Sequence, residues 1–304
     1  MTTPHRAGFV ALLGKPNAGK STLLNNILGE KLAAVSALPQ TTRDRLFGIH
    51  SDTTCQIVFV DLPGVLEPTD RLNECLSENV RSGIKDVDLI VHLVDVGDPE
   101  PLTKPMMELL QAARCPVVLA LNKLDGKRLR TDAGSWAGEK LPGDARERYT
   151  AILGLSAKEG HGIPDLLETI RGVLPEGPPF YDPETITDRD MRFLAQEMIR
   201  EKAFLHLHEE LPYAVAVEIR EFQEREAGKW YIAADLHVER DSQKGIVIGK
   251  KGETLRRISS EARRDIERLC QAPVYLDLWV KVRPKWRKRD ADLRRFGYTP
   301  PKRK

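Results

Sequence analysis

Short apolar runs alternate with amphipathic stretches through the first 175 residues of the chain. Polar residues bound each run, and the stretches between them carry leucine, isoleucine or valine at helical spacing. The pattern predicts strands at 9–13, 45–51, 55–60, 89–94, 117–121 and 153–156, and helices at 21–28, 72–84, 102–113 and 163–174. Such alternation predicts an α/β domain with a mostly parallel sheet, whose ligands lie at the carboxyl ends of the strands.

A second pattern follows residues 175–179, whose proline and glycine content is typical of a linker. It predicts a long helix at 188–209, antiparallel strands at 214–222 and 230–238 around a turn at 227–228, a helix at 253–269 and a last strand at 274–282. This order predicts a separate α+β domain, in keeping with the two domains that 304 residues indicate.

The strand at 9–13 leads into Gly-Lys-Pro-Asn-Ala-Gly-Lys-Ser, which matches the phosphate-binding P-loop pattern. Its glycines let backbone N–H groups point inward at a helix N-terminus, where anions are favoured. Lys20 is expected to reach the β- and γ-phosphates of a nucleotide, and Ser21 to bind Mg²⁺. The whole loop is predicted to bind nucleotide: Gly14, Lys15, Pro16, Asn17, Ala18, Gly19, Lys20 and Ser21.

Two later segments are expected to sense the γ-phosphate. The polar segment at 33–44 lies where proteins with this kind of P-loop carry a switch loop. Either Thr41 or Thr42 is the candidate residue for closing over Mg²⁺, and Thr42 is favoured. Asp61 ends an apolar strand, as a Walker B aspartate does, and Gly64 can offer its N–H to the γ-phosphate. The predicted contacts of this second segment are Asp61, Leu62, Pro63, Gly64 and Val65.

The sequence Asn-Lys-Leu-Asp at 122–125 predicts which base is bound. Asp125 is an acceptor that can take both donors on one edge of guanine, and adenine would leave it unpaired. Asn122 is expected either to contact the opposite edge of the base or to tie neighbouring loops together, and Lys123 to lie across the purine face. Ser156, Ala157 and Lys158 follow the next strand, where a backbone N–H near Ala157 can donate to guanine O6.

A Gly-x-x-Gly sequence in the second part predicts contact with nucleic acid. Gly249, Lys250, Lys251 and Gly252 lie between two helical segments, and by itself this pattern is equally typical of a helix–helix turn. The surrounding order of helices and strands favours a KH domain, in which the glycines let an RNA backbone approach and the lysines contact phosphates.

Charge is unevenly distributed along the chain. Residues 281–304 hold eleven lysines and arginines and two aspartates, a net charge of +9, so the remainder sums to −7. A basic segment of this kind favours a polyanionic partner, although a solvated tail would have the same composition. Trp286 in this segment is predicted either to stack on a base or to pack as a surface or hinge residue.

Cysteine spacing and hydropathy bear on the compartment. The four cysteines show no metal-binding spacing, and we expect reduced thiols, mostly buried. The sequence has no signal segment and no run of 18 apolar residues, so we expect a soluble intracellular protein, in the cytoplasm. A monomer is expected separately, since no feature of the sequence bears on the oligomeric state.

Taken together, these motifs resemble the Era family of bacterial GTPases, over nearly the whole chain. The most specific parts are the P-loop, Pro-Gln-Thr-Thr-Arg at 39–43, Asn-Lys-Leu-Asp at 122–125 and Ile-Val-Ile-Gly-Lys-Lys-Gly at 246–252. The resemblance implies a Ras-like P-loop GTPase domain with a mixed, mostly parallel sheet, followed by an α+β type II KH domain. We place the GTPase domain at 7–175, the linker at 176–187, the KH domain at 188–286 and a basic tail at 287–304.

The resemblance also implies GTP and GDP as ligands, Mg²⁺ as cofactor, and binding near the 3′ end of small-subunit ribosomal RNA. It implies a role in maturation of the small ribosomal subunit and peripheral association with the inner face of the cell membrane. Lys20, Thr42, Gly64 and Asn17 are then the residues expected to support hydrolysis.

Two positions depart from common patterns. Leu62 stands where the family usually has threonine, and Val65 stands where Ras-type enzymes carry the glutamine that orients water. Related GTPases use the residue equivalent to Asn17 to hold a monovalent cation, so slow hydrolysis stimulated by K⁺ or by RNA is expected.

Three hypotheses follow for the whole protein. The favoured one is a switch in which GTP hydrolysis controls RNA binding. The alternatives are a constitutive RNA-binding protein with a structural nucleotide, and a GTPase whose KH-like half docks on a protein or a membrane.

Overall fold

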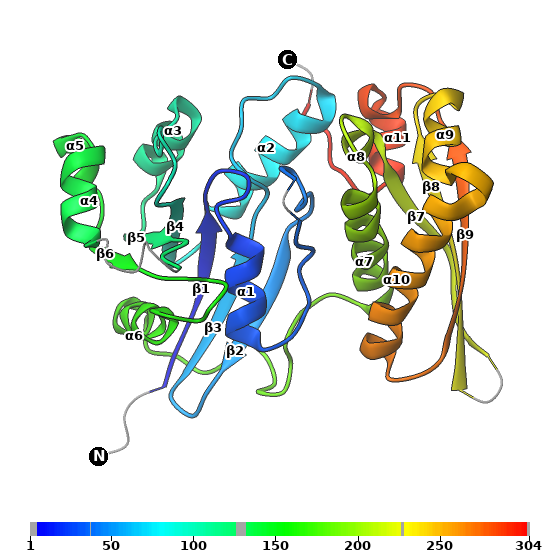
Figure 1. Cartoon of the computed structure of the whole chain (residues 1–304). Helices are drawn as coiled ribbons and strands as arrows, with labels where there is room; N and C mark the ends of the chain where they lie inside the picture. Colours follow the sequence, from blue (N-terminus) through cyan, green and yellow to red (C-terminus); the bar gives the residue numbers. More distant parts are fainter. Residues whose placement is uncertain (1–4, 37, 126–131, 226–227, 303–304) are drawn as a thin grey trace. The chain divides into compact units, whose positions relative to one another are not determined.

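The computed structural model describes residues 5–36, 38–125, 132–225 and 228–302 (Figure 1). Within them the chain forms two compact units. The first unit contains the chain up to Ala33, Thr42–Glu67 and Leu76–Asp188, and the second contains Ala34–Thr41, Pro68–Cys75 and the chain from Arg189 onward. Two short segments of the N-terminal half therefore belong to the second unit.

The first unit is built on a six-stranded sheet of order β2-β3-β1-β4-β5-β6. Only β2 and β3 pair antiparallel, and every other neighbouring pair is parallel. The strands are β1 (Arg6–Leu13), β2 (Leu46–Ser51), β3 (Cys55–Asp61), β4 (Leu89–Asp95), β5 (Val117–Asn122) and β6 (Ala151–Gly154). The mixed, mostly parallel sheet predicted from the sequence is confirmed.

Helices cover both faces of this sheet, which explains why β3 and β5 are buried along their whole length. The helices are α1 (Lys20–Leu28), α2 (Arg71–Gly83), α3 (Lys104–Ala112), α4 (Ala133–Lys140), α5 (Gly143–Arg146) and α6 (Ile163–Val173). Figure 1 shows α1 and α6 on the near side of the strands. Side chains of α2, α3 and α4 form one core with strand residues, and this core includes Val80, Met106 and Trp136.

The segment predicted as a linker lies along the first unit. The side-chain amide of Gln56, which is fully buried, accepts from the N–H groups of Phe180 and Tyr181 and donates to the Tyr181 carbonyl, at 2.7–2.9 Å. Further along, Thr187 forms an isolated bridge with Gly48 of β2. The first unit therefore holds residues 180–187 in place, although their composition is that of a flexible connection.

The second unit contains a three-stranded sheet of order β7-β8-β9, in which β7 and β8 are antiparallel and β9 is parallel to β8. Its elements are α7 (Met191–His206), α8 (Leu211–Ala214), β7 (Ala216–Arg225), β8 (Lys229–Val238), α9 (Asp241–Ile248), the 3₁₀ turn η3 (Lys250–Gly252), α10 (Glu253–Cys270) and β9 (Val274–Val282). Helices α7 and α10 pack against one face of the sheet, in a core that includes Ile199, Ile258 and Leu236. The α+β order expected of a KH domain is confirmed, while Ala227 of the predicted turn lies outside the described residues.

The C-terminal segment is folded as far as the structure describes it, to residue 302. It forms η4 (Trp286–Lys288) and α11 (Asp290–Arg295). Trp286 is fully buried and donates its indole N–H to the Ala214 carbonyl at 2.8 Å. Of the two roles predicted for this tryptophan, stacking on a base is wrong, because its ring packs against Phe296 and Tyr298. The residue has a packing role, although it is buried instead of lying at the surface.

Several basic side chains of this segment already have acidic partners. Arg283 pairs with Asp292, Arg287 with Glu239, and Arg295 with Glu218. The net charge of +9 consequently overstates the positive charge that the segment offers to a polyanion.

The four cysteines, all within the described residues, form no disulfide. No helix in the described ranges is both long enough and apolar enough to cross a bilayer.

Candidate functional site

The P-loop connects β1 to α1 in a conformation that requires its glycines. Gly19 has φ of +100°, and a Cβ on it would lie 2.2 Å from Nδ2 of Asn122. A Cβ on Gly14 would lie 2.5 Å from the Leu93 carbonyl oxygen. Side chains at either position would move the loop, so the two glycines set its approach to neighbouring strands.

Lys20 is buried at the start of α1 and donates to the carbonyls of Gly14 and Lys15, both at 3.1 Å. Burial lowers the pKa of Lys20 from 10.5 to about 8, against the opposing effect of Asp61, because a buried ammonium loses hydration. The ammonium is thus held inside the loop, where an anionic ligand would stabilise its charge.

Three oxygen atoms from separate segments converge beside this lysine. The Ser21 hydroxyl donates to Oδ2 of Asp61 at 2.7 Å, and its Oγ lies 2.8 Å from Oγ1 of Thr42. One carboxylate and two hydroxyls form the hard-oxygen donor set that Mg²⁺ prefers, so the residues present fit that ion.

Thr41 faces a different environment from its neighbour. Its hydroxyl donates to the Leu38 carbonyl at 2.8 Å and lies 2.6 Å from the Ser36 hydroxyl, and its own carbonyl accepts from Arg200 of α7. Of the two candidate threonines, Thr42 is the one that the fold brings to Ser21.

The segment after β3 lies against the P-loop. The Val65 N–H donates to the Gly14 carbonyl at 3.0 Å, and a Cβ on Gly64 would lie 2.6 Å from the backbone of Pro16. Leu62 is fully buried, so a threonine is not needed to pack this turn. Val65 is also buried, and its aliphatic side chain cannot orient water.

Asn122 ties two loops together. Its Nδ2 donates to the Ala18 carbonyl at 2.7 Å, and its Oδ1 accepts from the Ala157 N–H at 2.8 Å. Of the two roles predicted for this amide, the structure has the connecting one. Because Asn122 engages the Ala157 N–H, the donor to guanine O6 within 156–158 stays a prediction.

The residues predicted to contact the base lie at the ends of β5 and β6. The Ser156 hydroxyl donates to Oδ1 of Asp125 at 2.8 Å, which orients that carboxylate. Lys123 has φ of +67° and pairs with Asp95 at 2.8 Å. Lys158 is exposed, with Glu159 at 3.8 Å.

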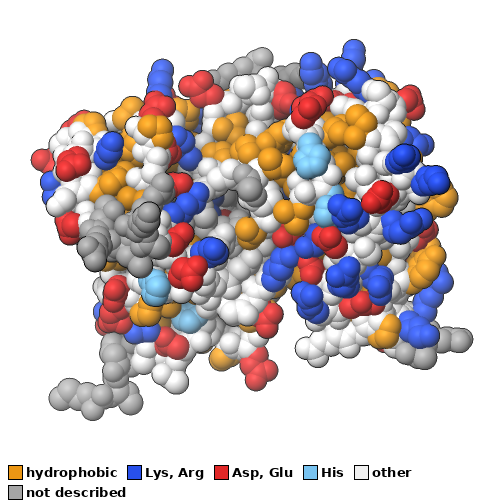
Figure 2. Space-filling model, viewed as in Figure 1, with side chains coloured by type: hydrophobic (Ala, Val, Ile, Leu, Met, Phe, Trp, Pro, Cys, Tyr) orange, Lys and Arg blue, Asp and Glu red, His pale blue; other side chains and the backbone are white. Residues whose placement is uncertain are grey.

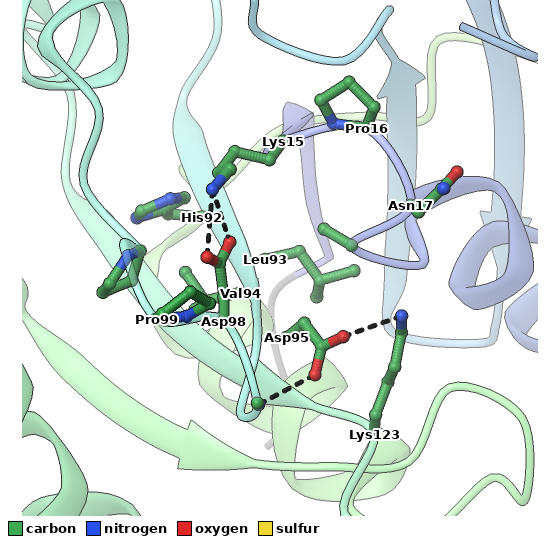
Figure 3. A pocket seen from close by; sticks show the side chains of 13 residues that line it. Lys15, Pro16, Asn17, His92, Leu93, Val94, Asp95, Asp98, Pro99 and Lys123 are labelled. Atoms are coloured by element: carbon green, nitrogen blue, oxygen red, sulfur yellow. Dashed lines mark hydrogen bonds and ion pairs between the residues drawn. The ribbon is translucent and has the colours of Figure 1, made fainter. Parts of the chain in front are cut away.

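A cavity of about 240 Å³ lies beside the P-loop, between it and the end of β4 (Figure 3). Lys15 points across it to Asp98, with Nζ 2.8 Å from Oδ2, and Asp95 and Lys123 lie at another part of its wall. Neither Asp95 nor Asp98 was predicted as a site residue. Asp95 directly follows the predicted strand at 89–94, and that position was the available signal.

His92 of β4 also lines this cavity, and no motif around it predicts a site residue. Its Nδ1 lies 2.8 Å from the Tyr149 hydroxyl, and burial together with Lys20 lowers its pKa to about 3. The ring is therefore neutral at physiological pH, and a second positive charge next to Lys20 is avoided.

The Gly-x-x-Gly sequence of the second unit joins α9 to α10. Gly249 and Gly252 have φ of +76° and +77°, and Lys251 between them has φ of +52°. Lys250 and Lys251 are exposed to solvent. Figure 2 shows lysine and arginine side chains gathered over α9 and α10, with acidic side chains among them.

A groove of about 450 Å³ begins at Gly252 and runs between α10 and β9. On the helix it is lined by leucine, serine and arginine side chains, including Arg256 and Arg263, and on the strand by residues from Tyr275 to Leu278. A groove with an apolar floor and basic walls, next to a glycine loop, suits a nucleic-acid strand.

The same unit also contains three neighbouring side chains of the kinds that bind metal ions. Glu218, Asp235 and His237 have ligand atoms within 4.8 Å of one another. However, Glu218 pairs with Arg295, and Asp235 pairs with both Arg220 and Lys281. The group is thus an ion-pair network rather than a metal site.

Comparisons with known proteins match both parts of the chain. Residues 9–123 match the family model of the 50S ribosome-binding GTPases, and residues 210–287 match that of the KH domain. The chain is 44% identical over 298 residues to the GTPase Era of Geotalea uraniireducens, covering 96% of this chain and 98% of that protein. It is also 40% identical over 301 residues to the GTPase Era of Lactobacillus delbrueckii, covering 98% and 97%.

Solved structures give the same result. An Era variant of Aquifex aeolicus bound to GDP and AlF₄⁻ superposes with a TM-score of 0.89 at 36% identity, covering 97% of this chain and 99% of that one. Era in complex with MgGDPNP and nucleotides 1506–1542 of 16S ribosomal RNA gives 0.88 at 36% identity, with the same coverage. With both domains matched over nearly its full length, this chain belongs to the Era family of GTPases.

Proposed function

We propose that this chain binds GTP with Mg²⁺, hydrolyses it to GDP and phosphate, and uses the cycle to control binding to small-subunit ribosomal RNA during assembly of the small subunit. The observation that carries the proposal is the convergence of Ser21, Thr42 and Asp61 beside Lys20. A P-loop that only held a nucleotide in place would need no threonine from a separate loop.

Positioning supports the chemistry of this site. Lys20 would stabilise the β- and γ-phosphates, the Gly64 N–H would face the γ-phosphate, and Ser21, Thr42 and Asp61 would hold the metal. When bound, Mg²⁺ neutralises charge that develops on the phosphate oxygens. Because Val65 cannot orient water, we propose slow intrinsic hydrolysis, with Asn17 binding K⁺ near the phosphates.

Base selection follows from Asp125. The Ser156 hydroxyl occupies part of Oδ1 and leaves the carboxylate oriented as an acceptor. Replacing Asp125 by asparagine turns one of the two carboxylate oxygens into an amide donor. A donor at that place suits the O2 carbonyl of xanthine instead of the amine of guanine. Asp125→Asn should therefore prefer xanthosine triphosphate to GTP in a competition assay.

A matched variant controls for lost charge. Asp95→Asn removes the carboxylate that pairs with Lys123 but faces no base edge in the proposal. Asp95→Asn should weaken the binding of both nucleotides, and the protein should still prefer GTP to xanthosine triphosphate. An Asp125→Asn protein that still favoured GTP would contradict the assignment of this residue.

RNA binding is proposed for the Gly-x-x-Gly loop and the groove between α10 and β9. The related Era structure that holds a 16S ribosomal RNA segment supports this partner. Residues 34–41 lead directly to Thr42, and 68–75 follow the Gly64 turn, yet both belong to the second unit. Closure of Thr42 over a nucleotide would thus act on segments that pack with the KH domain.

RNA affinity measured with a GTP analogue and with GDP tests this switch. The two affinities should differ, and Thr42→Ala should remove the difference. Thr169→Ala, which removes an exposed hydroxyl on α6, should preserve it. Equal affinities in the unmodified protein would favour a constitutive RNA-binding protein, and no RNA binding would favour docking on a protein or membrane.

The remaining parts of the proposal concern context. We propose a monomer in the cytoplasm that associates peripherally with the inner face of the cell membrane. Sedimentation of the purified protein with and without anionic lipid vesicles tests both points, since a monomer that stays in the supernatant would exclude the membrane association.

A further inference from the structure

The sheet of the second unit has two faces with different surroundings. Ile232, Ala234 and Leu236 of β8 and Leu276 and Val280 of β9 belong to the hydrophobic core under α7 and α10. Alternate residues of a strand point to opposite sides, so the residues between them point away from those helices. We call this second side the outer face.

The C-terminal segment covers one end of the outer face. The ring of His237 packs against Phe296 at 4.8 Å, and Arg295 of α11 pairs with Glu218 of β7 at 2.9 Å. His237 is consequently buried. Asp235, two residues earlier on the same side of β8, is also buried and pairs with Arg220 and Lys281.

The outer face also carries exposed aromatic rings, two of them on the edge strand β9. Tyr275 and Trp279 of β9 are 67% and 57% exposed. Tyr275 stacks on Tyr231 of β8, with ring centroids 5.9 Å apart and planes 10° from parallel, and the Arg225 guanidinium lies 3.7 Å from the Tyr231 centroid. We call these four residues the outer-face platform.

We propose that the outer-face platform is a second RNA-contacting surface. RNA bases would stack on it where the RNA chain leaves the groove between α10 and β9. Continuity between the two surfaces carries this inference, because Tyr275 belongs to the platform and also lines the groove. Exposed aromatic faces accept any base, and an arginine over a ring adds a cation to the stack. The proposal rests on the RNA binding proposed above.

The spacing along β9 indicates separate bases. Tyr275 and Trp279 are four residues apart on the same side of the strand, which corresponds to about 13 Å. One base cannot bridge that distance, so each ring would take its own. The bound strand would then be longer than the four nucleotides that a Gly-x-x-Gly loop clamps.

The charge around the platform indicates how it contributes. Asp277 lies between Tyr275 and Trp279 on the same side of the strand, and Glu221 is 3.7 Å from Arg225. Acidic side chains therefore lie among the residues of the platform, so the platform attracts phosphate groups only weakly. Affinity from the platform should come from stacking and vary little with salt, whereas Lys250 and Lys251 should supply the salt-dependent part.

Binding of the full chain to a fluorescein-labelled single strand from the 3′ end of the 1506–1542 segment of 16S ribosomal RNA tests the proposal. Tyr275→Ala and Trp279→Ala should each weaken binding about 5- to 150-fold, as loss of one stacked base does. The slope of log affinity against log salt should stay unchanged. Lys250→Ala should instead lower that slope by about 0.7.

Tryptophan fluorescence supplies a second readout. Bound RNA should quench the exposed Trp279, and Trp279→Phe should lose most of the quenching while it keeps the affinity, because phenylalanine still stacks. Both rings are exposed, so these variants are expected to fold.

The outcomes separate the two proposals. No RNA binding by the unmodified chain would overturn the proposed function itself. RNA binding that Lys250→Ala weakens, but that Tyr275→Ala and Trp279→Ala leave unchanged, would overturn the platform alone. The exposed rings would then be a docking surface for a protein.

Discussion

Asn122 offers the sharpest test of how the nucleotide site is held together. Its amide is buried and joins the Ala18 carbonyl to the Ala157 N–H. Asn122→Ala would leave both backbone groups buried without this partner, and each such loss costs about 1–3 kcal/mol. The total of about 2–6 kcal/mol is a large fraction of the roughly 5–15 kcal/mol that stabilises a typical domain.

The cost should be divided between folding and ligand binding, because the two loops need the amide to keep their spacing. Urea denaturation of the nucleotide-free protein and calorimetric titration with GDP measure the two parts. Asn122→Asp separates the two hydrogen bonds, because it keeps the acceptor for Ala157 and removes the donor to Ala18. Asn122→Asp should therefore lower the unfolding free energy and the GDP affinity by less than Asn122→Ala does. This holds when the new carboxylate is solvated enough for the protein to fold.

Asn26→Ala is the matched control. That asparagine is exposed on α1, and its side-chain amide donates to the Lys158 carbonyl of the same loop over a long distance of 3.5 Å. It should change neither quantity by more than about 0.5 kcal/mol. If Asn122→Ala matched Asn26→Ala in both assays, the connecting role assigned to the amide would be wrong.

Two other side chains give independent predictions. The pKa of Lys20 is lowered to about 8, so the nucleotide-free folded state binds fewer protons than the unfolded state between about pH 8 and 10.5, and its unfolding free energy should rise with pH in that window. Phosphates favour the charged form, so GDP binding above pH 8 should take up a proton, measured by calorimetry in buffers of different ionisation enthalpy; Lys15→Met should keep this uptake and Lys20→Met should lose it. Trp286→Ala should lower the free energy of unfolding by about 3–5 kcal/mol, because a buried ring is removed, whereas Trp279→Ala should cost less than about 0.5 kcal/mol. Similar urea midpoints for these two tryptophan variants would contradict the burial assigned to the C-terminal segment.

Local sequence was sufficient for most of the fold and for the outline of the nucleotide site. The P-loop could be predicted because its glycines, lysine and serine are contiguous and flanked by an apolar run and an amphipathic helix. The strand at 274–282 was predicted with the bounds that the structure has, since its alternation reflects one buried face.

Contacts between distant residues could not be predicted in the same way. Nothing near Gln56 indicates that its amide holds residues 180 and 181, which lie more than 120 positions away. The composition of the C-terminal segment indicated a basic tail without folded elements, because hydrophobic positions such as Leu293 and Phe296 are too few to form a visible period. Their partners are supplied by the sheet.

The folded C-terminal segment has a consequence for how the second unit can be isolated. Trp286, Leu293 and Phe296 are buried, and Phe296 packs against His237 of β8. A fragment that ended at Val282, the last residue of β9, would leave the apolar surface under these residues in contact with water. A stable fragment of this unit should therefore extend beyond the KH core to Tyr298, which packs against Trp286.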